Sequence, residues 1–301
     1  MRLNALAGTG PLTATKIYQP NGTQDDAGDV TVSVLDPNAV VASSGAATKT
    51  GAGDTTAYSF VLSLPVLATP TSHRVTWTRA TGGIIPVVDT LEVSENGLFT
   101  EDDARNYTIG GAQKPLGGDD GPTDYPDQVI AAARLAIGEM FEDRTGRSWY
   151  ARYCRREISP IHATKYVRLV GPCRRADGYR VAGPGAAQDL IRILSCKING
   201  DVVPSDELYW DEGGVFWSGG YFPAGSGTAP FPVVIEYVYG MDPVPWEARD
   251  MALRMLLANL VPSDISGYAT SLSNEDGTFR LTTFPRQVEE WLRFHRPAGV
   301  A

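Results

Sequence analysis

The side chains that most often carry catalysis are few in this sequence and lie far apart. The only histidines are His73, His162 and His295, so few imidazole side chains are available for general acid–base catalysis. No G-x-S-x-G, G-x-x-x-x-G-K-[ST] or H-E-x-x-H motif is present, so the local signatures of serine hydrolases, P-loop proteins and zinc peptidases are missing. Paired Asp or Glu residues leave no local signature, so a carboxylate-based hydrolase stays open. We expect no catalytic residue, no cofactor and no enzymatic activity.

Two groups of residues could be considered as metal ligands. Cys154, His162 and Cys173 lie within one 20-residue window, but C-x-x-C or H-x-x-x-H spacing and a fourth ligand are missing. The acidic run 101–103 consists of adjacent carboxylates, which cannot converge on one ion without partners, and we expect a solvated turn there. With Cys196 the cysteines number three, which does not define a disulfide framework and favours a reducing compartment. We expect no metal site.

Arginines form the strongest charge cluster of the chain. Residues 144–180 hold ten basic and two acidic side chains, and the whole chain has 21 arginines against five lysines. This pattern fits an electropositive patch for phosphate or an acidic protein, and equally a solvated face of strands and loops. Arginine suits bidentate protein contacts, which favours a protein partner over nucleic acid. The candidate interface residues, including three from the last predicted helix, are Arg144, Arg147, Arg152, Arg155, Arg156, Arg174, Arg175, Trp291, Phe294 and Arg296.

Aromatic residues suggest a second kind of site. Trp210, Trp217 and Tyr221 lie close together in a strand-rich stretch and could form a platform on which sugars stack, although aromatic residues in strands more often belong to a core. The alternative function is therefore a carbohydrate-binding or carbohydrate-cleaving protein.

The elements that would position these residues fall into two domains. A chain of 301 residues with 43% hydrophobic and 20% charged residues can build two cores. No apolar run is long enough for a membrane span, and the first residues lack the apolar region of a signal peptide. We therefore expect neither a membrane association nor secretion.

The first domain, residues 1–96, is predicted to be an immunoglobulin-like β-sandwich. Alternation is clearest where Tyr58, Phe60 and Leu62 share one face, and Trp77 is expected in the core. Turn-rich segments separate the runs at the spacing of a small sandwich. The predicted strands cover 15–19, 29–35, 57–64, 73–79 and 84–93.

The second domain, residues 125–301, is predicted to be a small helical domain with a β-rich insert, so the whole chain is α+β. A Gly, Pro and Asp-rich linker is expected over 97–124. Asp124 is the expected N-cap of the first helix and Gly146 is expected to end it. Trp246 is expected on the buried side of the second helix. The predicted helices cover about 126–143, 244–260 and 285–296, and the insert about 148–240.

The order of these elements resembles the head-to-tail connector (adaptor) proteins of long-tailed double-stranded DNA bacteriophages. The resemblance covers about 170 residues and lies in the order of the segments, none of which is an enzymatic signature. The segments are IAAARLAIGEMFEDRTGRSWY (130–150), ILSCKINGDVVPSDELYW (193–210), IEYVYGMDPVP (235–245) and LTTFPRQVEEWLRFHR (281–296).

This resemblance implies a structural virion protein rather than an enzyme. Connectors form a homo-oligomeric ring, commonly of twelve copies, between the portal protein and the next tail-side connector or terminator protein. Genomic DNA passes through the lumen during ejection without specific binding, and a net charge of −9 fits that demand, since each neutralised phosphate adds affinity. The implied location is the head-to-tail interface of the virion, after assembly in the host cytoplasm. The sandwich would be an addition in front of the connector domain.

Overall fold

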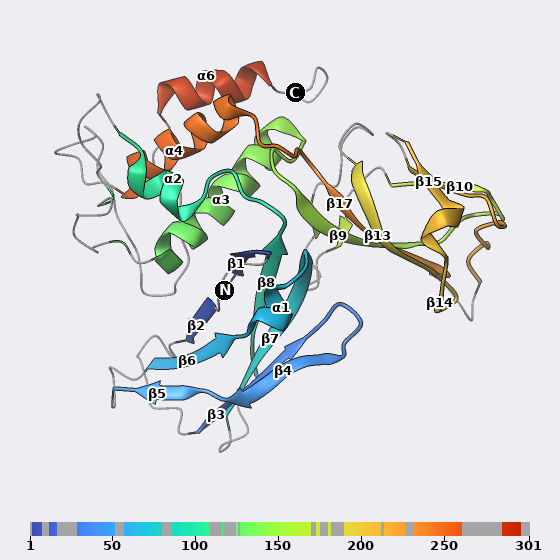
Figure 1. The fold of residues 1–301 in the computed structure, drawn as a ribbon, viewed down its shortest axis with the longest axis horizontal. Coiled ribbons are helices and arrows are strands. Elements are labelled where there is room, and N and C mark those ends of the chain that lie inside the picture. The colour runs from blue at the N-terminus through green and yellow to red at the C-terminus, as the bar shows by residue number, and fades with distance from the viewer. Residues whose placement is uncertain are drawn as a thin grey trace. The chain divides into compact units, whose positions relative to one another are not determined.

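The protein is a mixed α+β chain made of two compact units, as a computed structural model shows (Figure 1). Unit 1 runs up to Glu95 and unit 2 begins at Asn96. The α+β class predicted from the sequence is confirmed. The structure describes residues 2–7, 12–16, 29–51, 57–79, 86–108, 116, 125, 127–169, 173–174, 180–181, 190–211, 214–226, 231–260 and 285–295.

Unit 1 contains a five-stranded and a three-stranded sheet. The larger has the order β1-β8-β7-β3-β4 and the smaller β2-β6-β5. The β1–β8 pair is parallel and the other pairs are antiparallel. The elements are β1 (Arg2–Leu6), β2 (Leu12–Lys16), β3 (Val30–Leu35), β4 (Val41–Ala46), β5 (Thr48–Thr50), β6 (Ala57–Leu62), α1 (Leu64–Leu67), β7 (Thr71–Arg79) and β8 (Val87–Ser94).

Both sheets of unit 1 contribute to one hydrophobic core. Tyr58 and Leu62 of the smaller sheet belong to the same buried cluster as Val32 and Trp77 of the larger one. Trp77 is buried as predicted, and its indole Nε1 donates a hydrogen bond to Asp89 Oδ2 at 2.8 Å. This bond satisfies the one polar atom of a side chain that otherwise contributes apolar area.

His73 of β7 is a buried titratable group in unit 1. Its Nε2 lies 3.0 Å from the Val66 carbonyl oxygen, so the ring is held as a donor there. Burial lowers the pKa of His73 from its ordinary value of 6.5, although the hydrogen bond to the Val66 backbone and the charge of Asp36 oppose the shift. The neutral ring is therefore the form that the folded unit prefers.

Unit 1 is accordingly expected to lose stability as the pH falls below about 6.5. The pKa of His73 is higher in the unfolded chain than in the folded one. The stabilisation is therefore complete above the unfolded pKa and is lost as the pH falls towards the folded pKa. Urea unfolding at each pH, followed by pulsed hydrogen exchange at one fixed labelling pH, measures this in peptides from β7. His73→Gln should weaken the pH dependence and His162→Gln should not; equal dependence in all three proteins would contradict the assignment.

Unit 2 has a helical body with four described helices. They are α2 (Glu101–Asn106), α3 (Asp127–Thr145), α4 (Trp246–Leu260) and α6 (Arg286–Phe294). The last three start and end within two residues of the predicted ranges. Asp124, the expected N-cap of α3, lies outside the described residues. Gly146 ends α3 as predicted: its φ is 70° and its N–H donates to the Glu142 carbonyl at 2.7 Å, a backbone conformation that glycine adopts without strain.

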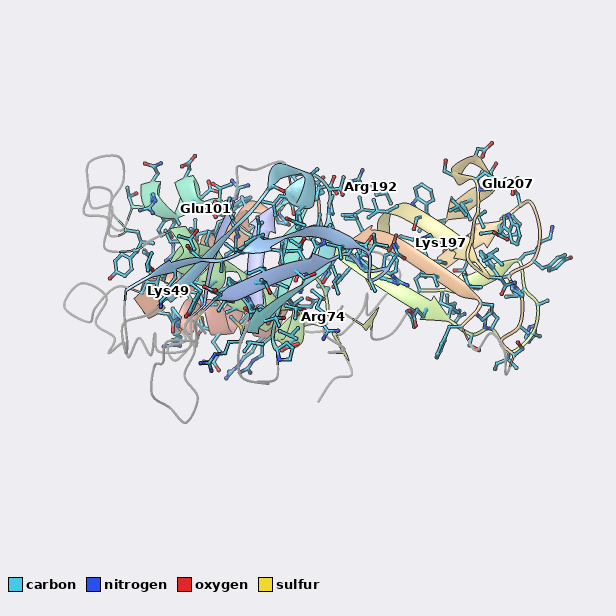
Figure 2. The ribbon with its side chains drawn as sticks, turned by 90° about the horizontal axis from the view of Figure 1, so that it is seen from below. Lys49, Arg74, Glu101, Arg192, Lys197 and Glu207 are labelled. Atoms are coloured by element: carbon cyan, nitrogen blue, oxygen red, sulfur yellow. The ribbon has the colours of Figure 1, made fainter. Side chains whose placement is uncertain are left out.

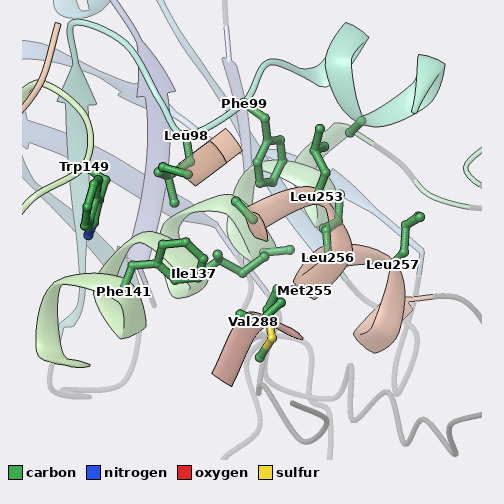
Figure 3. Close-up of a cluster of buried hydrophobic side chains, with 14 of the residues drawn as sticks. Leu98, Phe99, Ile137, Phe141, Trp149, Leu253, Met255, Leu256, Leu257 and Val288 are labelled. Atoms are coloured by element: carbon green, nitrogen blue, oxygen red, sulfur yellow. The ribbon is translucent and has the colours of Figure 1, made fainter. Parts of the chain in front are cut away.

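The helices of the body pack around one apolar core (Figure 3). Buried side chains come from three of these helices: Ile137 and Phe141 from α3, Met255 from α4, and Val288 and Leu292 from α6. All five side chains are at most 4% exposed. This burial, rather than helix propensity, holds a helix as short as α6 in place.

The linker predicted over 97–124 is wrong for residues 97–108. Leu98 and Phe99 are buried in the helical core, and the acidic run expected as a solvated turn forms the first turn of α2. Thr100 caps that helix by a capping box with Asp103, with bonds of 2.8 and 3.0 Å. Carboxylates at a helix N-terminus are favoured by the free N–H groups there, which explains why this acidic segment is ordered.

The rest of unit 2, residues 152–239, forms what we term the β lobe. A six-stranded sheet has the order β12-β11-β9-β17-β13-β14, and a three-stranded sheet the order β10-β16-β15. The elements are β9 (Arg152–Ile158), β10 (Tyr166–Arg168), β11 (Cys173–Arg174), β12 (Arg180–Val181), β13 (Leu190–Ile198), β14 (Asp201–Val202), the 3-10 turn η4 (Ser205–Glu207), β15 (Leu208–Trp210), β16 (Gly214–Trp217) and β17 (Val233–Tyr239).

The two sheets of the β lobe share a second buried cluster. It includes Val215 and Phe222 beside Ile235, Cys154 and Cys196. In the sheet Cys154 lies opposite Tyr237 and Cys196 opposite Ile235, so β17 separates the two free thiols. Burial raises the pKa of Cys196 to about 12, which makes this thiol inert at neutral pH.

A buried polar group joins the β lobe to the helical body. Glu142 of α3 forms an ion pair with Arg152 of β9, and both side chains are almost fully buried. The Tyr239 hydroxyl of β17 donates to the other Glu142 oxygen, Oε1, at 2.9 Å. One carboxylate is therefore held by the first residue of β9 and the last residue of β17.

Candidate interaction surfaces

The predicted arginine cluster does not form one continuous patch in the described part of the chain. Arg152 is 1% exposed and paired with Glu142, so its assignment to an interface is wrong. The guanidinium of Arg147 lies over the Trp149 ring at 5.2 Å, and Arg144 is exposed in the last turn of α3. These arginines do not form one patch because they lie in three different places: at the end of α3, at the buried junction with Glu142, and in β9.

The arginines of β9 point to both faces of the sheet. Arg155 lies opposite Glu236 and Arg156 opposite Ile235, and consecutive strand residues alternate between faces. Both are half-buried. The side chain of Arg174 lies outside the described residues, as do Arg175 and Arg296.

In the last helix, α6, the tryptophan packs against the core of the helical body. Trp291 lies 4.7 Å from Trp149 and 5.5 Å from Phe141 between ring centroids. Phe294, in contrast, is 84% exposed. Of the aromatic residues predicted for an interface on this helix, Phe294 is the one that faces solvent.

Trp246 was expected inside the second helix and is instead 72% exposed. It is the first residue of α4, where Ala248 and Ala252 fill the buried positions. A residue in the first turn has no preceding turn to lie against, so its side chain extends into solvent.

A group of exposed aromatic residues lies on the three-stranded sheet of the β lobe. Phe216 of β16 stands opposite Tyr166 of β10 on one side and Tyr209 of β15 on the other, so the three side chains share one face. Tyr209 is 58% and Phe216 38% exposed. The alternate positions, Val167 and Val215, are buried, which fixes the register of the strands.

A cation and a further tyrosine extend this face. The Lys165 Nζ lies 5.9 Å from the centroid of Phe216 and 5.3 Å from that of Tyr221, distances at which an ammonium is attracted to an aromatic ring. Tyr221 is 60% exposed. We call Tyr209, Phe216, Tyr221 and Lys165 the aromatic face.

The three residues predicted as a sugar platform are not equivalent. Trp217 packs on Phe222 with ring centroids 5.7 Å apart, and its Nε1 donates to Glu207 Oε2 at 2.8 Å (Figure 2 labels Glu207). Trp217 is therefore partly buried against the core of the β lobe. Trp210 and Tyr221 are 45% and 60% exposed. Tyr209 and Phe216, which carry the exposed row together with Tyr221, were not singled out from the sequence.

A shallow acidic hollow lies on the helical body. It has a volume of about 360 Å³, and Tyr107 and Leu253 contribute apolar surface to its lining. Asp102 and Asp103 of α2 also line it, and Arg249 Nη1 is 3.8 Å from Asp103 Oδ1. We call this site, lined by Asp102, Asp103, Asn106, Tyr107, Thr108 and Leu253, the acidic hollow.

Tyr107 is fixed in the lining of the hollow by a hydrogen bond. Its hydroxyl donates to Asp250 Oδ1 at 2.7 Å. Burial and this bond to a carboxylate raise the pKa of Tyr107 to about 12, so the phenol stays neutral. The hollow thus combines the apolar surface of Tyr107 and Leu253 with the carboxylates of Asp102 and Asp103.

Among the described residues, no cluster of three or more His, Cys, Asp or Glu side chains could hold a metal ion. No helix in the described part is long and apolar enough to cross a membrane. No protein-family model and no curated protein matches the chain.

Proposed function

We propose that this chain is a head-to-tail connector, a structural virion protein that forms a ring between the portal and the tail. Its work is done by surfaces that contact copies of itself, the portal protein and the next tail-side protein. The genome passes through the ring without specific binding, and no chemical step is required of any side chain.

The observation that carries the proposal is the organisation of unit 2. Helices α3, α4 and α6 pack on one core, and the β lobe is inserted between α3 and α4. This is the element order on which the resemblance to connectors rests. The β lobe also exposes Tyr209, Trp210 and Tyr221, aromatic side chains of the kind enriched at protein interfaces.

Charge supports a channel for DNA. Residues 96–151 and 240–301 together hold eleven basic and eighteen acidic side chains, and the chain as a whole has a net charge of −9. An acidic lumen repels phosphate and releases no counterions on contact, so DNA slides past without being retained.

For unit 1 we propose an immunoglobulin-like β-sandwich at the periphery of the ring. Its support is the pair of sheets that cover one core, with Trp77 buried among residues from both. The parallel β1–β8 pair sets it apart from a purely antiparallel sandwich.

Light scattering tests the ring directly. The full chain, mixed with the portal protein of the same genome, is expected to form a species whose mass exceeds that of the portal by many multiples of 32.4 kDa. A chain that remains a monomer in the presence of the portal would contradict the proposal.

A carbohydrate-binding function is the second candidate, because Trp210 and Tyr221 are exposed rather than in the core. Stacking on a sugar would require Tyr221 and its neighbours to be free in the assembled protein. Binding to a glycan array that disappears in Tyr221→Ala would favour this function, and the absence of glycan binding would remove it.

A further inference from the structure

We infer that the aromatic face of one copy docks into the acidic hollow of the neighbouring copy, and that this contact closes the ring. The inference rests on the proposed function and names the surfaces through which the copies would associate. A cyclic ring needs a heterologous interface, in which one surface of each subunit fits a different surface of the next.

The aromatic face has the composition of an interface centre. Tyr209, Phe216 and Tyr221 are 38–60% exposed. Tyr209 and Phe216 lie on strands β15 and β16, whose other side is anchored in the lobe's core, and Tyr221 follows β16. Rigid aromatic anchors of this kind lose little conformational freedom on binding. Ile161, 96% exposed in the segment that leads into β10, is a further exposed apolar side chain of the lobe.

The acidic hollow offers the complementary chemistry. An aromatic ring can pack on the apolar surface of Tyr107 and Leu253 in the hollow, while the ammonium of Lys165 beside it meets the carboxylate of Asp102. Asp102 is exposed, so a partner can reach it.

The charges of the two parts of unit 2 agree with this pairing. Residues 152–239, the β lobe, hold ten basic and nine acidic side chains, whereas the helical part of the chain has seven more acidic than basic ones. Two lobes or two helical bodies therefore attract each other less than a lobe attracts a helical body. This asymmetry favours head-to-tail association over a two-fold dimer.

Truncation of the aromatic face tests the inference. Phe216→Ser and Tyr209→Ser are each expected to weaken self-association of the full chain by about 30-fold, the loss typical of an interface hot spot. The matched control is Phe231→Ser, also in the lobe, 51% exposed and outside the aromatic face, which should assemble as the unchanged protein does. Sedimentation velocity, with and without the portal protein, measures the effect, and circular dichroism checks that each variant is folded.

Charge reversal identifies the partner surface. Lys165→Glu and Asp102→Lys are each expected to weaken association at least about tenfold, because each brings like charges together. The two changes combined in one chain should restore much of the loss, since positions 165 and 102 then again carry opposite charges. Failure of the double variant to recover would overturn the pairing of these two surfaces.

The remaining outcomes separate this inference from the proposed function. Rings that form on the portal equally well with Phe216→Ser would overturn the inference and leave the connector function standing. A wild-type chain that never assembles, with or without portal, would overturn both. Glycan binding lost in Phe216→Ser would reassign the aromatic face to saccharides.

Discussion

Replacing Glu142 with alanine is expected to destabilise unit 2 by about 3–5 kcal/mol, because it leaves the Arg152 guanidinium buried without its carboxylate. Arg152 is 1% exposed and cannot turn to solvent. The same change removes the acceptor of the Tyr239 hydroxyl, whose hydrogen bond of 2.9 Å is also buried. Urea unfolding followed by pulsed hydrogen exchange in peptides from α3 and β9 gives the free energy.

A triple variant separates an uncompensated charge from lost packing. Glu142→Leu, Arg152→Met and Tyr239→Phe together replace the polar group by apolar side chains of similar volume, an exchange that is often close to neutral. The triple variant should therefore be clearly more stable than Glu142→Ala. A loss below about 1 kcal/mol in Glu142→Ala would mean that the junction is solvated, contrary to the structure.

Phe141→Ala should cost a similar amount, about 3–5 kcal/mol, through a cavity in the helical core. Phe141 is fully buried and its ring lies 5.5 Å from that of Trp291. Because Trp291 is partly buried against this core, the variant should also accelerate hydrogen exchange in peptides that cover 286–294. The free energy is measured as for Glu142→Ala.

Two exposed aromatic residues are matched controls for this cavity. Phe294→Ala on α6 and Trp246→Ala on α4 remove side chains that are 84% and 72% exposed, so each should change stability by no more than about 0.5 kcal/mol. If Phe294→Ala were as costly as Phe141→Ala, the orientation of α6 would be wrong.

Helices with a repeated apolar spacing could be predicted from the sequence. In α3 the spacing of Ala133, Ile137 and Phe141 specifies which side is buried, and Gly146 specifies where the helix ends, because both depend on residues within one or two turns. The burial of Trp77 followed in the same way from strand alternation.

Features that depend on distant partners could not be predicted. From the sequence alone, Arg152 cannot be distinguished from a surface arginine, because only the folded structure shows that Glu142 of α3 is its partner. The segment 97–108 reads as a linker by composition, although the Thr100–Asp103 capping box was a local signal that could have revealed α2. Strands β4 and β5 have small or polar residues that are mostly exposed, so no apolar alternation marked them.

The candidate surfaces were predicted least well. Exposure of Tyr209 and Phe216 is set by which side of the three-stranded sheet is buried, and Val215 and Phe222 decide that only after both sheets of the β lobe have formed. Charge counting found an arginine-rich segment but could not divide it between the two faces of β9, since alternation places neighbouring residues on opposite sides.

Electron microscopy of the full chain mixed with the portal protein of the same genome is the most direct measurement of the central claim. The connector account predicts a closed ring of this chain, coaxial with the portal and open along the axis for DNA. Portal particles with no added density, beside separate single copies of this chain, would contradict it.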